Sequence, residues 1–210
     1  MKSPDTQVKV CGMTNLKDAL AAVESGADAI GFIFYKKSPR SVNMKTVREI
    51  VAELPPFVDT VGVFVNETAD QINKIADRCK LDRIQLHGDE SPAFCNKIRR
   101  RVIKAIRVKD MQSLKNLSNY PVSSFLLDTY SEEQKGGTGK IFDWNLVHPA
   151  KKCGPVILAG GLTPNNVRQA IRRVQPYGVD VCSGVESQPG IKDHTKMKEF
   201  LNIVKTGKRI

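Results

Sequence analysis

The strongest constraint on the fold of this chain is a strand-like apolar run followed by a helical pattern, repeated eight times along its length. Strands are predicted at residues 8–11, 29–34, 58–65, 83–86, 102–106, 125–127, 156–159 and 179–182. Between them, apolar residues recur at the spacing of amphipathic helices. Because strands that alternate with helices are joined by right-handed crossovers into a parallel sheet, eight units predict an α/β fold, a closed (β/α)8 TIM barrel. An open dinucleotide-binding sheet is disfavoured, since no G-x-G-x-x-G motif follows the first strand.

We expect residues 1–210 to form this one barrel domain, because no linker or low-complexity segment separates the units. Side chains that cap helices mark several of the predicted helix starts. One of them, Asp110, is expected to begin a helix whose buried face holds Met111, Leu114 and Leu117.

The charge of the chain allows two interpretations. Lysine and arginine number 33 against 22 acidic residues, which gives a net charge of +11. The chain is therefore either a nucleic-acid or membrane-surface binder, or a protein with a basic surface and a small anionic substrate. The basic residues are spread along the chain and cluster only at 99–101 and 205–209, and no aromatic residues interleave with them as a base-stacking platform requires. This pattern favours the small anionic substrate, with no nucleic acid and no membrane as partner.

The five cysteines, an odd number, show no C-x-x-C spacing, and the three histidines lie far apart. This distribution argues against a disulfide framework and against a metal site. The first ten residues contain no apolar signal core, and the chain has no run of 18 apolar residues, so a cytoplasmic location is expected. Four cysteines are assigned structural roles: Cys79, Cys95, Cys153 and Cys182.

The sixth predicted strand delivers a carboxylate to its end. The apolar run 125–127 is followed directly by Asp128, and a polar loop then leads to glycines at 136, 137 and 139. Glycines allow a backbone to approach a ligand closely and to point its N–H groups at it. This arrangement favours acid–base chemistry beside an anion, and the alternative is a carboxylate that only caps a turn. Gly137 is accordingly a candidate substrate-binding residue.

The barrel fold selects a specific set of candidate residues, because functional groups in such barrels project from the C-terminal ends of the strands. Cys11 ends the first strand, where a cysteine is more often a small buried apolar residue than a catalyst. Its position opposite Asp128 and over a phosphate site favours the second role, because a thiolate can act as a general base. Gly160 and Gly161 follow the seventh strand, and Ser183 and Gly184 follow the eighth; these are the loops in which barrels commonly bind phosphate.

Arg40, in the loop after the second strand, is placed at the same end of the barrel. An arginine there can bind a carboxylate or phosphate through two parallel hydrogen bonds, although a solvated loop charge remains the alternative. His87, after the fourth strand, also reaches this end, and the sequence assigns it no definite role.

These residues lie in motifs that resemble the phosphoribosylanthranilate isomerase family. The motifs are KVCGMT, GFIFYKKSPRSV, QLHGDE, LLDT, GGTGKIFDW, ILAGGLTPNNV and GVDVCSGVESQPGIKD, and they run in the family's order over about residues 9–193. Two small departures are Val10, where the family often has isoleucine, and Cys182, where a small polar residue is common.

The resemblance implies an isomerase of tryptophan biosynthesis, the third step from chorismate, that converts N-(5-phosphoribosyl)anthranilate into 1-(2-carboxyphenylamino)-1-deoxyribulose 5-phosphate. It implies an Amadori rearrangement that needs no cofactor and no metal. Carried onto this chain, it makes Asp128 the general acid and Cys11 the general base. Arg40 becomes the partner of the anthranilate carboxylate, and the glycine turns become the phosphate site. Whether the chain is a monomer or a homodimer stays open.

Two other functions are considered. One is another phosphosugar aldose–ketose isomerase barrel, of the histidine-pathway type, which usually has an acid where this chain has Cys11 and which consists of two related halves. The other is a barrel without catalysis that binds anions or nucleic acid through its basic surface. Polynucleotide affinity that falls steeply with salt is the property that identifies the second.

Overall fold

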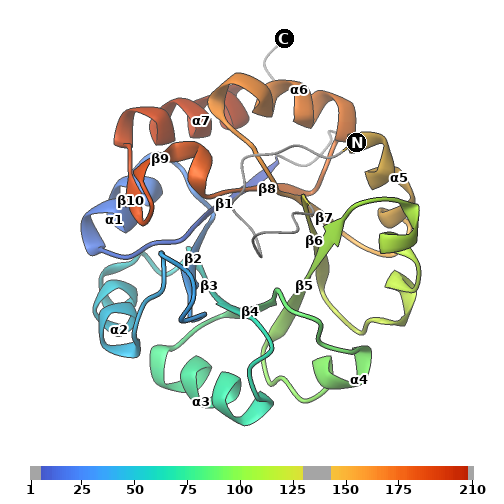
Figure 1. Ribbon diagram of the computed structural model, residues 1–210. Helices are drawn as coiled ribbons and strands as arrows, with labels where there is room; N and C mark the ends of the chain where they lie inside the picture. Colours follow the sequence, from blue (N-terminus) through green and yellow to red (C-terminus); the bar gives the residue numbers. More distant parts are fainter. Residues whose placement is uncertain (1–5, 130–142, 208–210) are drawn as a thin grey trace.

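The computed structural model describes residues 6–129 and 143–207, in which eight parallel strands close into a barrel (Figure 1). The strands are β1 (Gln7–Cys11), β2 (Ala29–Ile33), β3 (Asp59–Phe64), β4 (Arg83–Leu86), β5 (Arg101–Val108), β6 (Ser124–Thr129), β7 (Val156–Leu158) and β8 (Gly178–Val181). Each strand pairs with the next one in the chain, and β1 pairs with β8 to close the ring. The (β/α)8 barrel predicted from the sequence is confirmed.

Helices form a ring outside the strands (Figure 1). They are α1 (Leu16–Glu24), α2 (Met44–Glu53), α3 (Ala69–Cys79), α4 (Pro92–Cys95), α5 (Val147–Ala150), α6 (Pro164–Val174) and α7 (His194–Thr206). Short 3-10 helices supplement them: η1 (Met111–Leu114), η2 (Leu117–Asn119), η3 (Trp144–Leu146) and η4 (Ser183–Val185). Within the described residues, no helix is long and apolar enough to cross a membrane.

The period-two alternation of the strands separates the residues that face the helices from those that face the barrel axis. On β1, Val8 and Val10 belong to the main core between strands and helices. A separate buried cluster holds residues of the other face: Val61, Ile103, Ala105, Leu126, Ile157 and Ala159. Lys9 and Cys11 take the alternate positions of β1, so the strand directs its two chemically active side chains to one face.

Two features of the sequence-based prediction need correction. The helix expected after Asp110 is instead the pair of 3-10 helices η1 and η2. Asp110 caps the first turn as expected, but Asn116 adopts a left-handed φ of 70° that breaks the helix, and Met111 is half exposed. The sequence pattern also missed a hairpin after β8, formed by β9 (Glu186–Gln188) and β10 (Ile191–Lys192).

Candidate active site

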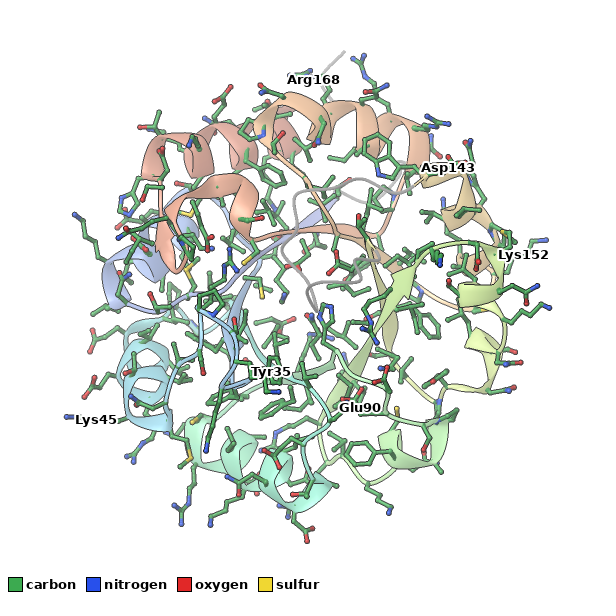
Figure 2. The ribbon with its side chains drawn as sticks, in the orientation of Figure 1. Tyr35, Lys45, Glu90, Asp143, Lys152 and Arg168 are labelled. Atoms are coloured by element: carbon green, nitrogen blue, oxygen red, sulfur yellow. The ribbon has the colours of Figure 1, made fainter. Side chains whose placement is uncertain are left out.

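One cavity at the C-terminal end of the barrel brings Cys11, Arg40 and Asp128 together. Its other lining residues come from β2, β3, β4, β8 and the segments that follow them: Ile33, Tyr35, Ser38, Val63, Val65, Gln85, His87, Asp180 and Cys182. Figure 2 looks along the barrel and shows Tyr35 inside the ring of helices. Four side chains that the sequence placed at this end, those of Cys11, Arg40, His87 and Asp128, therefore share one cavity.

Cys11 lies beside a buried ion pair. Lys9, two residues earlier on the same face of β1, bonds Asp180 across the β1–β8 junction, with 2.8 Å between Lys9 Nζ and Asp180 Oδ1. A Cβ on Gly31 would lie 2.7 Å from Cys11 Sγ and 3.0 Å from Lys9 Cε, so only glycine leaves room for the sulfur and the lysine stem. Burial raises the pKa of Asp180 to about 7. Burial works against the charge of Lys9, but Asp180 and Cys11 outweigh it and raise the pKa of Lys9.

Cys182, assigned a structural role from the sequence, lies next to Cys11. The parallel register of β1 and β8 pairs Val10 with Val181, so the next residue of each strand is a cysteine. The hydrogen bond from Cys182 lowers the pKa of Cys11 well below its ordinary value; burial opposes this shift, and the charges of Lys9 and Lys192 assist it. The same hydrogen bond, together with burial, raises the pKa of Cys182. Both shifts favour the thiolate at Cys11 and the thiol at Cys182.

Asp128 is almost fully buried, and the backbone fixes its carboxylate. Oδ1 accepts a hydrogen bond of 2.8 Å from the backbone N–H of Thr129, and Oδ2 lies 3.3 Å from Nε2 of His87. A Cβ on Gly160 would lie 2.8 Å from Oδ1, which explains why this position, with φ of 82°, is glycine.

His87 is oriented by Gln85. The amide nitrogen of Gln85 lies 2.9 Å from Nδ1 of His87, and if that nitrogen donates, the histidine proton sits on Nε2 and faces Asp128. Nε2 makes no aligned hydrogen bond within the described residues. The sequence showed that His87 reaches the barrel mouth but could not show this contact, which depends on the separation of β4 and β6 in space.

Arg40 is not a solvated loop charge, because its side chain is only 12% exposed and forms an ion pair with Glu186. Nε lies 2.9 Å and 3.1 Å from the two carboxylate oxygens, and Nη2 lies 2.7 Å from Oε2. Burial alone would raise the pKa of Glu186, but hydrogen bonds from Arg40 and Lys192 lower it below its ordinary value. Sequence reasoning missed Glu186 and Lys192, since both belong to the hairpin it did not predict.

The glycine turns lie at the same end of the barrel but do not line this cavity. Gly160 and Gly161 have φ of 82° and 65° and lead into α6, which Thr163 and Asn166 cap. Gly184 packs directly on the carbonyl oxygen of Leu162, so the turns after β7 and β8 touch each other. Ser183 and Gly184 begin η4. Gly137 lies outside the described residues.

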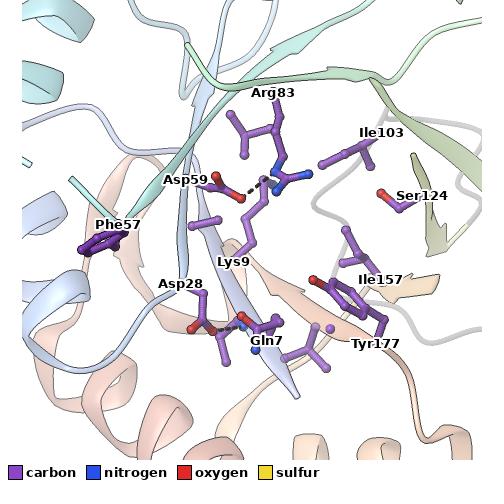
Figure 3. A pocket seen from close by; sticks show the side chains of 15 residues that line it. Gln7, Lys9, Asp28, Phe57, Asp59, Arg83, Ile103, Ser124, Ile157 and Tyr177 are labelled. Atoms are coloured by element: carbon purple, nitrogen blue, oxygen red, sulfur yellow. Dashed lines mark hydrogen bonds and ion pairs between the residues drawn. The ribbon is translucent and has the colours of Figure 1, made fainter. Parts of the chain in front are cut away.

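A second and larger cavity, of about 220 Å³, opens at the opposite end of the barrel (Figure 3). Its lining includes the ion pair of Asp59 and Arg83, with 2.6 Å between Oδ2 and Nε. Lys9 reaches it from β1, whereas Cys11 and Asp128 do not line it. The acid–base groups therefore belong to the smaller cavity.

Comparison with known proteins identifies related sequences over nearly the whole chain. The family model described as N-(5'-phosphoribosyl)anthranilate (PRA) isomerase matches residues 8–203. A relative from Geotalea uraniireducens with that enzyme name is 56% identical over 200 residues, which cover 95% of this chain and 98% of the relative. The enzyme of the same name from Geobacter sulfurreducens is 54% identical over 199 residues, covering 95% and 98%.

Solved structures agree. The phosphoribosylanthranilate isomerase of Thermotoga maritima superposes with a TM-score of 0.90 at 48% identity, covering 96% of this chain and 99% of that one. A phosphoribosylanthranilate isomerase in complex with reduced 1-(o-carboxyphenylamino)-1-deoxyribulose 5-phosphate superposes with a TM-score of 0.87 at 46% identity and the same coverage. A third structure, with a TM-score of 0.87, 44% identity and coverage of 96% and 99%, is of monomers generated from the dimeric Thermotoga maritima enzyme.

Proposed function

This chain belongs to the N-(5'-phosphoribosyl)anthranilate isomerase family, and we propose that Cys11 and Asp128 divide the proton transfers of its reaction between them. The enzyme converts N-(5'-phosphoribosyl)anthranilate into 1-(2-carboxyphenylamino)-1-deoxyribulose 5-phosphate, a step of tryptophan biosynthesis. The observation that carries the proposal is the single cavity lined by the thiol, the carboxylate and Arg40.

In the first step, Asp128 donates a proton to the ribose ring oxygen. The bond between C1 and that oxygen breaks, and the lone pair of the anthranilate nitrogen forms the C=N bond of a Schiff base. The Cys11 thiolate then removes the proton from C2, and the electrons of that C–H bond move to give an enolamine. Tautomerisation of the enolamine yields the C2 ketone of the product.

The lowered pKa of Cys11 suits it to the second step, because a general base works best when it is already deprotonated near the operating pH. Arg40 is proposed to bind the anthranilate carboxylate through the part of its guanidinium that Glu186 leaves accessible. The glycine turns at 160–161 and 183–184 are proposed to bind the phosphate, which lies away from the reacting carbons and so orients the sugar.

The experiment is turnover of N-(5'-phosphoribosyl)anthranilate, followed by the loss of its fluorescence. Cys11→Ala and Asp128→Asn should each lower kcat by about 10²- to 10⁴-fold, the usual contribution of a general acid or base. Cys153→Ala, at an exposed cysteine remote from the cavity, should leave kcat unchanged. A general acid or base contributes far more than about three-fold. If kcat of either variant stays within about three-fold of wild type, another group must carry out that residue's proton transfer.

A further inference from the structure

Lys192 is a fully buried cation that lies behind the cavity wall, against Cys11 and Cys182. Its ammonium contacts four acceptors: the carbonyl oxygen of Cys11 at 2.6 Å, Oε1 of Glu186 at 2.9 Å, the carbonyl oxygen of Cys182 at 3.3 Å and, at the longest distance, Sγ of Cys182 at 4.0 Å. A lysine has three N–H donors, so these four acceptors satisfy the ammonium with protein groups alone. One side chain thus contacts the last residue of β1, the residue that follows β8 and the first residue of β9.

Glu186 carries the connection from Lys192 to Arg40. Its side chain is 4% exposed, and its carboxylate faces two cations, Lys192 and Arg40. The backbone N–H of Gly190 also donates to Oε1, at 3.3 Å. Because two cations share this one carboxylate, Glu186 does not fully neutralise Arg40, which leaves the guanidinium able to bind an anionic substrate group.

Arg40 retains binding capacity after pairing with Glu186. The ion pair uses Nε and Nη2 on one edge of the guanidinium, and within the described residues Nη1 makes no hydrogen bond. A planar guanidinium presents two edges, so fixing one edge orients the other. Gly12 assists, because a Cβ there would lie 2.9 Å from Cδ of Arg40.

The hairpin that supplies Lys192 and Glu186 is itself held against the start of α1. The backbone N–H of Lys192 donates to Asp18 Oδ2 at 2.8 Å, and the hydroxyl of Thr14 bonds the carbonyl of Gly190. The ammonium of Lys192 is therefore delivered from a fixed backbone, and its distance to Cys11 depends on packed elements and not on a free loop.

We propose that Lys192 and Glu186 are positioning residues for the isomerisation: Lys192 fixes the end of β1 that carries Cys11, and Glu186 orients the guanidinium of Arg40. This inference rests on the proposed function, because it assumes that Cys11 and Arg40 both engage the substrate. A buried charge network costs desolvation energy that an apolar plug would avoid. Because the network lies between Cys11 and Arg40, a role in positioning these two residues would explain why the chain keeps it.

The two residues are expected to affect different kinetic constants. Glu186→Gln keeps the shape and the bond between Lys192 and Cys11 but weakens the hold on Arg40, so it should raise KM on the order of 10-fold with little change in kcat. Lys192→Met removes the hydrogen bond to the Cys11 carbonyl and the ion pair with Glu186. It should therefore lower kcat as well as raise KM, with a loss in kcat/KM on the order of 100-fold.

A double-mutant cycle separates positioning from a general structural role. In the Arg40→Ala background, Glu186→Gln should cost less than about two-fold in kcat/KM, because Glu186 acts through Arg40. Arg83→Met is the control: it removes an ion pair at the other end of the barrel and should change neither constant.

Wild-type turnover of N-(5'-phosphoribosyl)anthranilate comes first; its absence would refute the proposed function and not this inference. With wild type active, additive losses in the cycle would overturn the positioning role of Glu186. Loss of kcat in Lys192→Met that only matches its unfolded fraction, measured by circular dichroism, would overturn that of Lys192. If Lys192→Met does not fold, Lys192→Arg supplies the same comparison with the charge retained and the hydrogen bonds of Lys192 displaced.

Discussion

Cys11 shows how a single residue acquires a chemical role from its neighbours. A buried thiol in apolar surroundings is harder to ionise, and burial does raise the pKa of Cys79 and Cys95. At Cys11 the opposite shift prevails, because Cys182 donates a hydrogen bond to its sulfur and two lysines lie nearby. The sequence alone could nominate Cys11 from its place at a strand end. It could not show Cys182 as its partner, since that contact depends on the register between the first and last strands.

Cys182→Ala should make the Cys11 thiol a weaker acid. Removing the hydrogen-bond donor destabilises the thiolate, so the pKa of Cys11 should rise towards its ordinary value. Because the thiolate is the reactive form, alkylation of Cys11 by iodoacetamide at pH 7 should slow, and the acidic limb of kcat/KM should move to higher pH.

The measurement is the pH profile of alkylation in a Cys153→Ser background, in which the exposed cysteine no longer reacts. Mass spectrometry of the labelled peptide identifies Cys11. An unchanged profile in Cys182→Ala would mean that the lysines alone set the ionisation of Cys11.

At the scale of elements, the sequence predicted the strands and helices that have a clear apolar periodicity and a helix cap. It failed where the conformation of a few residues determines the secondary structure. The eight strands are found within a few residues of their predicted bounds. Short apolar runs between helical segments are typical of strands that are buried on both faces. The segment after Asp110 has helical spacing, yet Asn116 turns left-handed and leaves two 3-10 turns. The hairpin of β9 and β10 is too short to show a period, although it holds Glu186 and Lys192.

The turn before α6 permits a test of the proposed phosphate site. Inorganic phosphate should raise the Tm of the wild type, because a ligand of the native state stabilises it. Gly161→Ala should lose most of this increment, since the added methyl group occupies a turn proposed to receive the phosphate and strains a backbone with φ of 65°. Thermal unfolding with and without phosphate measures both effects.

Gly26→Ala is the matched control, because Gly26 also has a positive φ, of 100°, but lies after α1 and away from the barrel mouth. It should lower the Tm and keep the increment. Gly184 is unsuitable for this test, since a Cβ there would collide with the carbonyl of Leu162 and disturb the fold. An equal increment in Gly161→Ala and wild type would place the phosphate elsewhere.

At the scale of the whole molecule, barrel closure converts distant sequence positions into neighbours. Lys9 and Asp180 are 171 residues apart and form a direct ion pair because β1 and β8 close the ring. The sequence could predict closure from the number of units, and from closure the end of the barrel at which Cys11 and Asp128 meet. It could not predict which charged side chains pair across that closure, since these pairings require the register. The net charge of +11 likewise describes the surface, whereas the site is decided by a few buried groups.

A buried ion pair joins successive units on another side of the barrel. Lys104 of β5 and Glu90, in the segment after β4, are each 2% exposed and lie 2.8 Å apart. Lys104 also donates to the carbonyl oxygens of Leu86 and Gly88, and Glu90 accepts from the backbone N–H groups of Asn66 and Gly88. The pair therefore connects the chain after β3, the chain after β4 and the strand β5.

Lys104→Met should destabilise the barrel by about 3–5 kcal/mol, because it leaves the buried carboxylate of Glu90 without its cation. Lys104→Met with Glu90→Gln should recover part of this loss, since no unpaired charge then remains. Arg99→Met, which removes an exposed ion pair with Asp77, should cost only about 0–1 kcal/mol. Urea unfolding at pH 7, with the slope m compared among the variants, measures all three changes in the free energy of unfolding. A loss below about 1 kcal/mol in Lys104→Met would mean that the surrounding backbone donors are enough to hold Glu90, and that the barrel does not depend on this pair.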